Sequence, residues 1–201
     1  MRIGVFGGTF DPIHFGHLRT VEKAAQVFGL ERVLWVPARL SPHKTEIPTD
    51  PRHRIAMLAL GLEHRPEWSI ELSELDREPP SYTVETLADI QARVLHDELW
   101  LLMGSDTLAT LDRWKHPEEI VKLARIASFY REPFSGASLR IPAIAGLANR
   151  LEVFDAGSVK ISATEIRSRI ARGESPAGQV PEPVAEYITK QGLYRSPVAP
   201  A

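Results

Sequence analysis

The sequence predicts an α/β protein in which a doubly wound parallel sheet is flanked by helices and followed by a small C-terminal helical segment. The apolar run at residues 3–6 is followed by glycine and has the length of a buried strand. Residues 18–28 carry apolar side chains at helical spacing, and a second apolar run follows at residues 32–36. A strand, a helix and a strand in this order imply two parallel strands joined by a right-handed crossover.

The rest of the chain continues to alternate strands with helices. Asp50 followed by Pro51 marks a helix start, because aspartate caps helices and proline suits their first turn. The run at residues 98–103 is the most apolar strand, so we expect it at the centre of the sheet. The other expected elements are strands at 68–72, 125–130 and 151–154, and helices at 83–95, 117–123, 142–148 and 182–190. The expected core includes Ile55, Leu58 and Leu62 on the helix after Asp50, and the tryptophans Trp35, Trp68 and Trp100.

Length and composition favour one domain over residues 1–195, with its helical part at about 162–195 and a frayed tail at 196–201. A net charge of -2 leaves no broad basic face, so nucleic acid is not an expected partner. The absence of cysteine excludes disulfides and thiol catalysis. No apolar run approaches the roughly 18 residues that span a bilayer, and the chain opens on a strand rather than a signal peptide. We therefore expect no membrane partner and a cytoplasmic location.

Residues 7–17, Gly-Gly-Thr-Phe-Asp-Pro-Ile-His-Phe-Gly-His, join the first strand to the first helix in a turn that suits a polyphosphate. The two glycines at its start have no side chains to keep a ligand off the backbone. The first N–H groups of a helix lack partners within it and stabilise an anion. His14 and His17 are close to one helical turn apart, so both rings can face one ligand, and Gly16 between them lets that ligand approach.

This glycine turn does not match other known phosphate loops. The glycines at positions 4, 7 and 8 have the wrong spacing for Gly-x-Gly-x-x-Gly, and no Gly-Lys-Ser/Thr follows, which excludes a Walker P-loop. A zinc site would need three or four ligands, and the chain has no cysteine to join the two histidines. We therefore expect no metal ligands in the chain. A purely structural glycine turn is the remaining alternative.

Three single residues are further candidates. Lys44 lies in a long polar loop, residues 38–50, where it is either solvated or placed over the glycine turn to neutralise phosphate charge. Asp106 follows the 98–103 strand at its carboxyl end, where parallel sheets bind ligands, and either caps a helix or accepts a hydrogen bond from a ribose hydroxyl. Trp114 lies among polar residues, which favours a stacking platform for a ligand over simple packing.

Two later segments carry helix starts. Thr83 can cap the helix that follows the prolines at 79 and 80. Ser162 and Glu165 fit the capping box Ser-x-x-Glu, so a helix with free N–H groups at its tip should begin there. Arg167 adds a planar fork of donors suited to phosphate. Each segment alone is explained as an ordinary capped helix, but beside the glycine turn the second becomes another anion clamp.

Together these motifs resemble the nucleotidyltransferase superfamily with the His-x-Gly-His signature. Over nearly its whole length the chain is similar to the bacterial nicotinate-mononucleotide adenylyltransferases. Residues 7–17 carry most of the resemblance, and the other matching blocks are 36–44, 80–87, 104–106, 111–114, 161–167 and 184–194. The resemblance implies a Rossmann-like sheet and an adenylyl transfer from ATP to nicotinate mononucleotide, which gives deamido-NAD and pyrophosphate.

The resemblance also implies roles for individual residues. The catalytic positions are His14, His17, Lys44 and Arg167. The ATP-binding positions are Gly7, Gly8, Thr9, Phe10, His14, His17, Gly104, Asp106, Ile161, Ser162, Thr164 and Arg167. The mononucleotide would meet Lys44, Tyr82, Thr83 and Trp114, with Thr83 at the nicotinate carboxylate and Trp114 on the pyridine ring. Mg²⁺ is the implied cofactor, held mainly by the phosphates of ATP and by water.

The sequence departs from the family pattern at two places. Ala163 replaces the second serine of the usual Ile-Ser-Ser-Thr, and residues 131–134 replace Arg-Pro-Gly with Arg-Glu-Pro-Phe, so we assign Arg131 no role. The alternatives are the same transfer to nicotinamide mononucleotide or to phosphopantetheine, and a non-catalytic nucleotide sensor. A class I aminoacyl-tRNA synthetase shares the histidine motif, but this chain lacks a Lys-Met-Ser-Lys-Ser loop. The sequence leaves the oligomeric state open.

Overall fold

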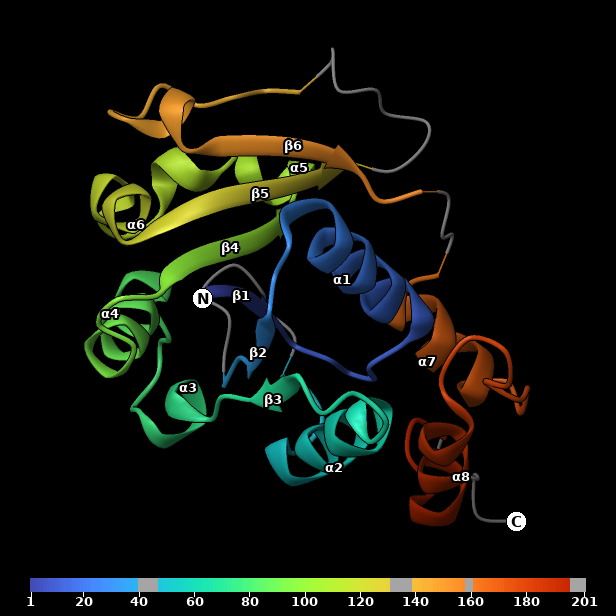
Figure 1. The fold of residues 1–201 in the computed structure, drawn as a ribbon. Helices are drawn as coiled ribbons and strands as arrows, with labels where there is room; N and C mark the ends of the chain where they lie inside the picture. Colours follow the sequence, from blue (N-terminus) through green and yellow to red (C-terminus); the bar gives the residue numbers. More distant parts are fainter. Residues whose placement is uncertain (40–46, 131–138, 158–160, 196–201) are drawn as a thin grey trace.

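The structure, a computed structural model, describes residues 1–39, 47–130, 139–157 and 161–195. Within these residues, six parallel strands form one sheet in the order β3-β2-β1-β4-β5-β6 (Figure 1). The strands are β1 (Arg2–Gly8), β2 (Arg32–Pro37), β3 (Trp68–Ile70), β4 (Glu98–Gly104), β5 (Ala124–Tyr130) and β6 (Leu151–Asp155). The most apolar strand, β4, pairs with β1 at the centre of the sheet, as the sequence predicts, because a strand covered on both faces needs apolar residues throughout.

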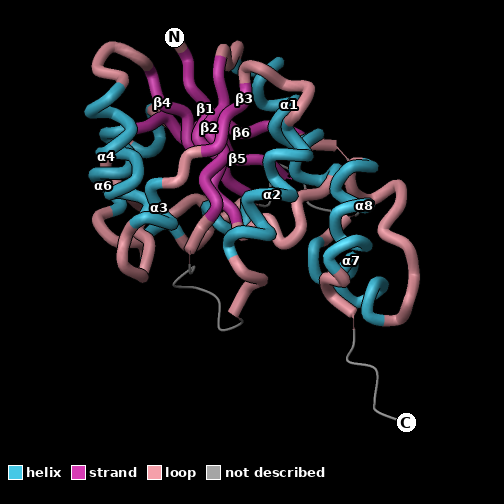
Figure 2. The backbone as a smooth tube through the Cα atoms, turned by 90° about the horizontal axis from the view of Figure 1, so that it is seen from below, coloured by secondary structure: helices cyan, strands magenta, loops and turns pink. Residues whose placement is uncertain are grey.

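Helices cover both faces of this sheet (Figure 2). α1 and α2 lie on one face with α7 and α8 beside them, and α3, α4 and α6 lie on the other. The helices are α1 (Phe15–Phe28), α2 (Pro51–Leu62), α3 (Ser73–Asp76), α4 (Thr83–Arg93), α5 (Ser105–Leu108), α6 (Pro117–Leu123), α7 (Ala163–Ala171) and α8 (Glu182–Gln191), with 3₁₀ turns η1 (Leu111–Arg113) and η3 (Leu147–Asn149). In the part of the chain that is described, no helix has the length and apolar character needed to cross a membrane.

Several helix ends follow signals in the sequence. α1 ends at Gly29, whose φ of 62° is the left-handed conformation that glycine adopts with little penalty. At the start of α2 the Asp50 side chain accepts a hydrogen bond from the backbone N–H of Arg52. At the start of α7 the Ser162 side chain accepts one from Glu165. These three ends were therefore predictable from local residues alone.

The side chains of β1 alternate between two hydrophobic cores, one on each face of the sheet. Phe6 belongs to the core beneath α1 and α2, whereas Val5 belongs to the core beneath α4 and α6. The tryptophans Trp35, Trp68 and Trp100 are all buried in the first of these cores, which confirms the prediction.

One predicted element is wrong, and another is shorter than predicted. The helix expected at 142–148 does not form, because Gly146 takes a left-handed φ of 80° and only the 3₁₀ turn η3 follows it. The strand expected at 68–72 stops at Ile70, and the short helix α3 begins at Ser73 without a periodic pattern long enough to indicate it.

Two predicted residue positions are also wrong. Thr83 does not cap α4, because the N-cap residue is Tyr82 and Thr83 is the first helical residue. On α2, Ile55 is only half-buried, and the neighbouring Arg54 is fully buried instead. An arginine in the core was not expected, since charged side chains are almost never fully buried without a partner.

Candidate active site

The two histidines of the glycine turn are held in a fixed arrangement at the start of α1. His14 is the N-cap residue of α1, and its Nδ1 accepts a hydrogen bond from the backbone N–H of His17 at 3.3 Å. The two rings stack with their centroids 3.7 Å apart and their planes 17° apart. His14 is buried, whereas His17 faces a cavity. The spacing of three residues therefore brings the two rings together, but only His17 lines the cavity. That both rings face one ligand stays a prediction.

The three glycines of the turn have different neighbours. A Cβ at Gly7 would meet no atom within 4 Å, so this position is open to a ligand. A Cβ at Gly8 would lie 2.8 Å from the ring of Phe10. A Cβ at Gly16 would lie 2.8 Å from Nδ1 of His14 and 3.2 Å from the carbonyl oxygen of Ile161. Gly16 therefore makes room for protein atoms, not for an approaching ligand as we expected.

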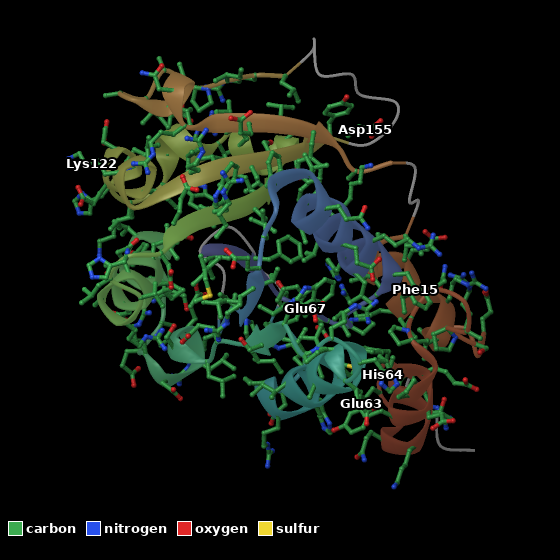
Figure 3. The ribbon with its side chains drawn as sticks, in the orientation of Figure 1. Phe15, Glu63, His64, Glu67, Lys122 and Asp155 are labelled. Carbon is green, nitrogen blue, oxygen red and sulfur yellow. The ribbon has the colours of Figure 1, made fainter. Side chains whose placement is uncertain are left out.

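The start of α7 meets the glycine turn, although the two lie near opposite ends of the chain. Nη1 of Arg167 donates a hydrogen bond to the backbone carbonyl of Asp11 at 2.9 Å, and Nη2 lies 3.5 Å from Oγ1 of Thr164. Phe15, the first residue of α1, lies at the end of α1 that meets α7 (Figure 3) and donates its N–H to the carbonyl of Gln179 at 3.0 Å. The expected convergence of the two helix tips is therefore confirmed.

One cavity of about 770 Å³ opens at the carboxyl ends of β1, β2 and β4. This is the switch point of the sheet, where the chain moves from one side of β1 to the other, and such crevices bind ligands in parallel α/β folds. The predicted site residues that line the cavity are Gly7, Gly8, Thr9, His17, Tyr82, Thr83, Gly104, Asp106 and Trp114. The predicted site residues that do not line it are Phe10, His14, Ile161, Ser162, Thr164 and Arg167, and Lys44 lies outside the described residues.

Asp106 faces the cavity from the first turn of α5. The helix has Gly104 as its N-cap residue and no side-chain cap, so the alternative that Asp106 caps a helix is wrong. A Cβ on Gly104 would collide with the Asp106 carboxylate. The glycine therefore lets this carboxylate fold back to the end of β4, where it is available to accept hydrogen bonds from a ligand.

The far side of the cavity is formed by the start of α4 and by the segment after η1. No side chain caps α4, so the N–H groups of its first turn point outward from Thr83 with the partial positive charge of a helix start. Nζ of Lys115 lies 4.2 Å above the centroid of the Tyr82 ring and 2.7 Å from a carboxylate oxygen of Glu85. Trp114 is half-buried, lines the cavity and packs against the core beneath α4. Packing is therefore confirmed, and stacking on a ligand stays a prediction.

The sequence did not indicate several residues that line the cavity, chief among them Glu74. Its carboxylate accepts a hydrogen bond from Oγ1 of Thr86 at 3.0 Å, and the Arg77 guanidinium donates to the same hydroxyl at 3.3 Å. Burial raises the pKa of the Glu74 carboxyl, while the Thr86 hydrogen bond and the charge of Arg77 act in the opposite direction. Thr86 lies in the segment 80–87 that matches the family pattern, so the sequence pointed to its neighbourhood. Glu74 lies on α3, a helix that no sequence pattern indicated.

The described residues contain no group of three His, Cys, Asp or Glu side chains that could hold a metal ion. Asp11 is the acidic residue within the glycine turn, and both of its carboxylate oxygens are engaged by protein donors. Oδ1 accepts from the hydroxyl of Tyr194 at 2.6 Å, and Oδ2 accepts from the N–H of Thr49 at 3.0 Å. The turn therefore offers backbone amides and imidazoles to a ligand, which suits an anion and not a bare cation.

A model of the cytidylyltransferase-like family matches residues 5–169. The chain belongs to the cytidylyltransferase-like family. The matched residues include both the glycine turn and the start of α7, so they contain the two tips that meet at Asp11.

Three relatives with similar sequences all carry one more specific description within this family. The chain is 39% identical over 197 residues to a protein of Herpetosiphon aurantiacus, with 96% of this chain and 98% of the relative covered. It is 40% identical over 202 residues to a protein of Roseiflexus, with 96% and 98% covered. A protein of Thermus thermophilus is 38% identical over 196 residues, with 97% and 100% covered. All three are described as probable nicotinate-nucleotide adenylyltransferases.

Solved structures share the fold. Plasmodium falciparum nicotinic acid mononucleotide adenylyltransferase complexed with NaAD superposes with a TM-score of 0.76 at 19% identity, covering 96% of this chain and 97% of that chain. The same enzyme complexed with APC gives a TM-score of 0.75 at 19% identity, with 96% of each chain covered. The expected Rossmann-like fold is therefore confirmed.

Proposed function

We propose that this protein transfers an adenylyl group from ATP to nicotinate mononucleotide, which forms the deamido dinucleotide and releases pyrophosphate. The observation that carries the proposal is that one cavity joins the glycine turn at β1 to the uncapped start of α4. Its volume of about 770 Å³ is within the usual range for small-molecule sites. The relatives described as adenylyltransferases of this type support the same reaction.

The phosphates of ATP would lie at the two helix tips. The glycine turn offers the backbone amides of Gly8, Thr9 and Phe10 beside the stacked rings of His14 and His17. Across the turn, Ser162 and Thr164 are exposed at the start of α7, where helix N–H groups stabilise an anion. Arg167 keeps this second tip against the first through Asp11 and supplies further donors for phosphate. Gly7, Gly104 and Ile161 would complete the ATP site through their backbones.

The acceptor would bind on the α4 side of the cavity. A carboxylate on the pyridine ring is favoured at the first turn of α4, because the amides after Tyr82 carry no side-chain cap. Trp114 would stack on the ring, and Asp106 would accept hydrogen bonds from ribose hydroxyls. Lys44, outside the described residues, is proposed to neutralise the phosphates that are being joined.

In this reaction a phosphate oxygen of the mononucleotide attacks the α-phosphorus of ATP in line, and pyrophosphate leaves. The nucleophile is already an anion near neutral pH, so no general base is needed. Catalysis then consists of holding two anions in line and stabilising charge that develops on pyrophosphate, through preorganised amides, imidazoles and guanidinium groups. Mg²⁺ bound to the phosphates of ATP would neutralise further negative charge. The engaged oxygens of Asp11 fit a metal held by ATP and water and not by the turn.

The decisive experiment measures pyrophosphate release when the protein is mixed with ATP, Mg²⁺ and nicotinate mononucleotide. Nicotinamide mononucleotide and phosphopantetheine replace the acceptor in parallel reactions. We expect rapid release with the acid and slower release with the amide, because the start of α4 favours an anion. Binding of ATP without release in any mixture would favour the nucleotide sensor instead, and faster release with the amide would favour the other mononucleotide.

A further inference from the structure

A fully buried arginine lies behind the glycine turn. Arg54 projects from the first turn of α2 and has no exposed surface. Its Nη1 donates a hydrogen bond to the carbonyl of Thr9 at 2.8 Å, and its Nε donates to the carbonyl of Thr49 at 2.9 Å. One guanidinium therefore ties the turn to the segment that enters α2.

The hydrogen bond to Thr9 fixes one peptide group of the turn. The peptide between Thr9 and Phe10 is trans, so the N–H of Phe10 points in the opposite direction from the carbonyl of Thr9. Since Arg54 holds that carbonyl toward α2, the Phe10 N–H is turned away from α2. Among the described residues, none accepts a hydrogen bond from this N–H.

The backbone at Phe10 is strained, which makes a restraint on it necessary. Phe10 has a φ of 50°, a left-handed conformation that costs a residue with a Cβ roughly 1–2 kcal/mol. Its ring is buried against Phe6, Trp35 and His17, so packing of the side chain restrains the residue itself. The bond from Arg54 to Thr9 holds the peptide just before it.

The stability of the fold does not by itself explain why a charged arginine occupies this buried position. Burial lowers the pKa of Arg54, against the opposing charge of Asp11, and its Nη2 is buried with no hydrogen-bond partner in the described part of the chain. An apolar residue of similar volume would avoid this desolvation penalty. Departures of this kind from the rules of core packing are typical of functional positions.

Thr49 is itself fixed by the same group of residues. Its N–H donates to Asp11 and its carbonyl accepts from Arg54. The second oxygen of Asp11 is held by Tyr194, which follows α8. The guanidinium of Arg54 is therefore held in a fixed position, and a side chain must be fixed in this way if it is to orient a neighbouring peptide group.

We propose that Arg54 is a positioning residue for ATP: by holding the Thr9 carbonyl it directs the Phe10 amide to the triphosphate. The inference rests on the proposed function, because it takes the ATP phosphates to be the ligand of the glycine turn. Arg54 does not touch the ligand, and its effect passes through one backbone N–H. It should thus change the affinity for ATP and leave the affinity for the mononucleotide unchanged.

The test compares Arg54→Met and Arg54→Lys with Arg52→Met, a matched control two residues earlier on α2 whose side chain is exposed. Affinity for α,β-methylene-ATP is measured by calorimetry without the mononucleotide, and KM is then measured for each substrate. Arg54→Met should weaken analogue binding about tenfold, the effect of one hydrogen bond to a charged group, with the KM for the mononucleotide within about twofold. Arg54→Lys keeps the charge but not the planar fork, so its loss should be smaller. Arg52→Met should bind like the unmodified protein.

A second measurement begins with the unmodified protein, so its first result does not depend on how a variant folds. In the unmodified protein labelled with ¹⁵N-phenylalanine, the analogue should shift the Phe10 amide signal strongly, and in Arg54→Lys the shift should shrink. An unshifted Phe10 amide, or folded variants that bind the analogue as Arg52→Met does, would overturn the inference. So would an equal loss of affinity for both substrates, which is what a merely structural role predicts. A protein that binds the analogue but makes no dinucleotide would overturn the proposed function alone.

Discussion

Arg167 donates a hydrogen bond from Nη1 to the backbone carbonyl of Asp11 at 2.9 Å, across 156 positions of sequence. Around this bond, Gly16 on α1 approaches the carbonyl of Ile161 so closely that a Cβ would lie 3.2 Å from it. The two contacts bring the starts of α1 and α7 to one side of the sheet. The site proposed here depends on that juxtaposition, because each helix start alone would offer only half of a triphosphate clamp.

The loss of His17 should abolish most turnover. In His17→Ala we expect kcat to fall by about 100-fold or more, the typical cost of losing one donor to a transition state. Pyrophosphate release measures the rate, and His64→Ala is the matched control because His64 is exposed at the end of α2 (Figure 3). A near-normal rate in His17→Ala would show that this ring takes no part in the chemistry.

Removal of the Trp114 ring should affect the acceptor and not ATP. Trp114→Ala should raise the KM for nicotinate mononucleotide about tenfold, as expected for lost stacking on one base, while the KM for ATP stays the same. Because the ring also packs in the core beneath α4, the variant should melt at a lower temperature, and Trp114→Phe should recover part of both losses. An effect confined to ATP would contradict the stacking role.

The Glu74 carboxyl should make stability depend on pH. Burial raises its pKa in the folded protein above the ordinary value of 4.5, so the folded state holds this proton more tightly than the unfolded chain does. Its contribution to stability is therefore greatest below 4.5 and declines as pH rises through the folded-state pKa. Glu74→Gln keeps an oxygen for Thr86 but cannot ionise.

Thermal unfolding between about pH 4 and about pH 8 measures this effect. We expect the unfolding temperature of Glu74→Gln to rise relative to that of the unmodified protein as pH increases. Glu186→Gln on the exposed face of α8 provides the control, which should follow the unmodified protein. Parallel curves for all three proteins would rule out a titrating carboxyl at Glu74.

Ser162 should stabilise α7 through its cap. The side chain accepts a hydrogen bond from the N–H of Glu165 at 3.2 Å, and loss of such a cap costs about 1 kcal/mol. Ser162→Ala should lower the free energy of unfolding in urea by this amount. Ser168→Ala, at an exposed position inside the same helix, should not lower it, because alanine is the better helix former there. Equal effects of the two changes would exclude the cap.

Tyr194 should connect the C-terminal segment to the glycine turn. Its hydroxyl donates to Asp11 at 2.6 Å, and burial followed by the Asp11 charge raises its pKa, so the donor proton stays in place at all ordinary pH values. Tyr194→Phe should cost about 1.5 kcal/mol, the value of a hydrogen bond to a charged group. The comparison is Tyr187→Phe, which removes only a contact with His53 between α2 and α8. A Tyr194→Phe protein as stable as Tyr187→Phe would contradict this connection.

Much of the site could be predicted because its parts are encoded locally. Each of three parts depends on neighbours within about four residues: the glycine turn, the cap at Ser162 and the strand that ends at Gly104. The aromatic Trp114 was identified by its polar surroundings, and the structure places it at the same cavity as Thr83. Lys44 and residues 131–134 lie outside the described residues, so the predictions for them remain predictions.

Other residues could not be predicted, because their surroundings are made by distant parts of the chain. Arg54 lies in a helix whose pattern indicated an apolar stripe, and only the packing of α2 behind the turn brings Thr9 to its guanidinium. Glu74 sits on a helix of four residues, too short for a periodic signal. Gly16 was assigned to ligand approach, whereas tertiary packing gives it the ring of His14 and the carbonyl of Ile161 as neighbours.

The sequence by itself determined the alternating strands and helices, the glycine turn and the two helix starts that suit an anion. These features follow from backbone freedom, capping and hydrophobic period, all of which act between near neighbours. Only the tertiary structure decided that Arg167 meets Asp11, that Arg54 donates a hydrogen bond to Thr9 in the turn and that Glu74 reaches the cavity. Those contacts depend on how the helices pack on the sheet, and that packing is a property of the whole chain.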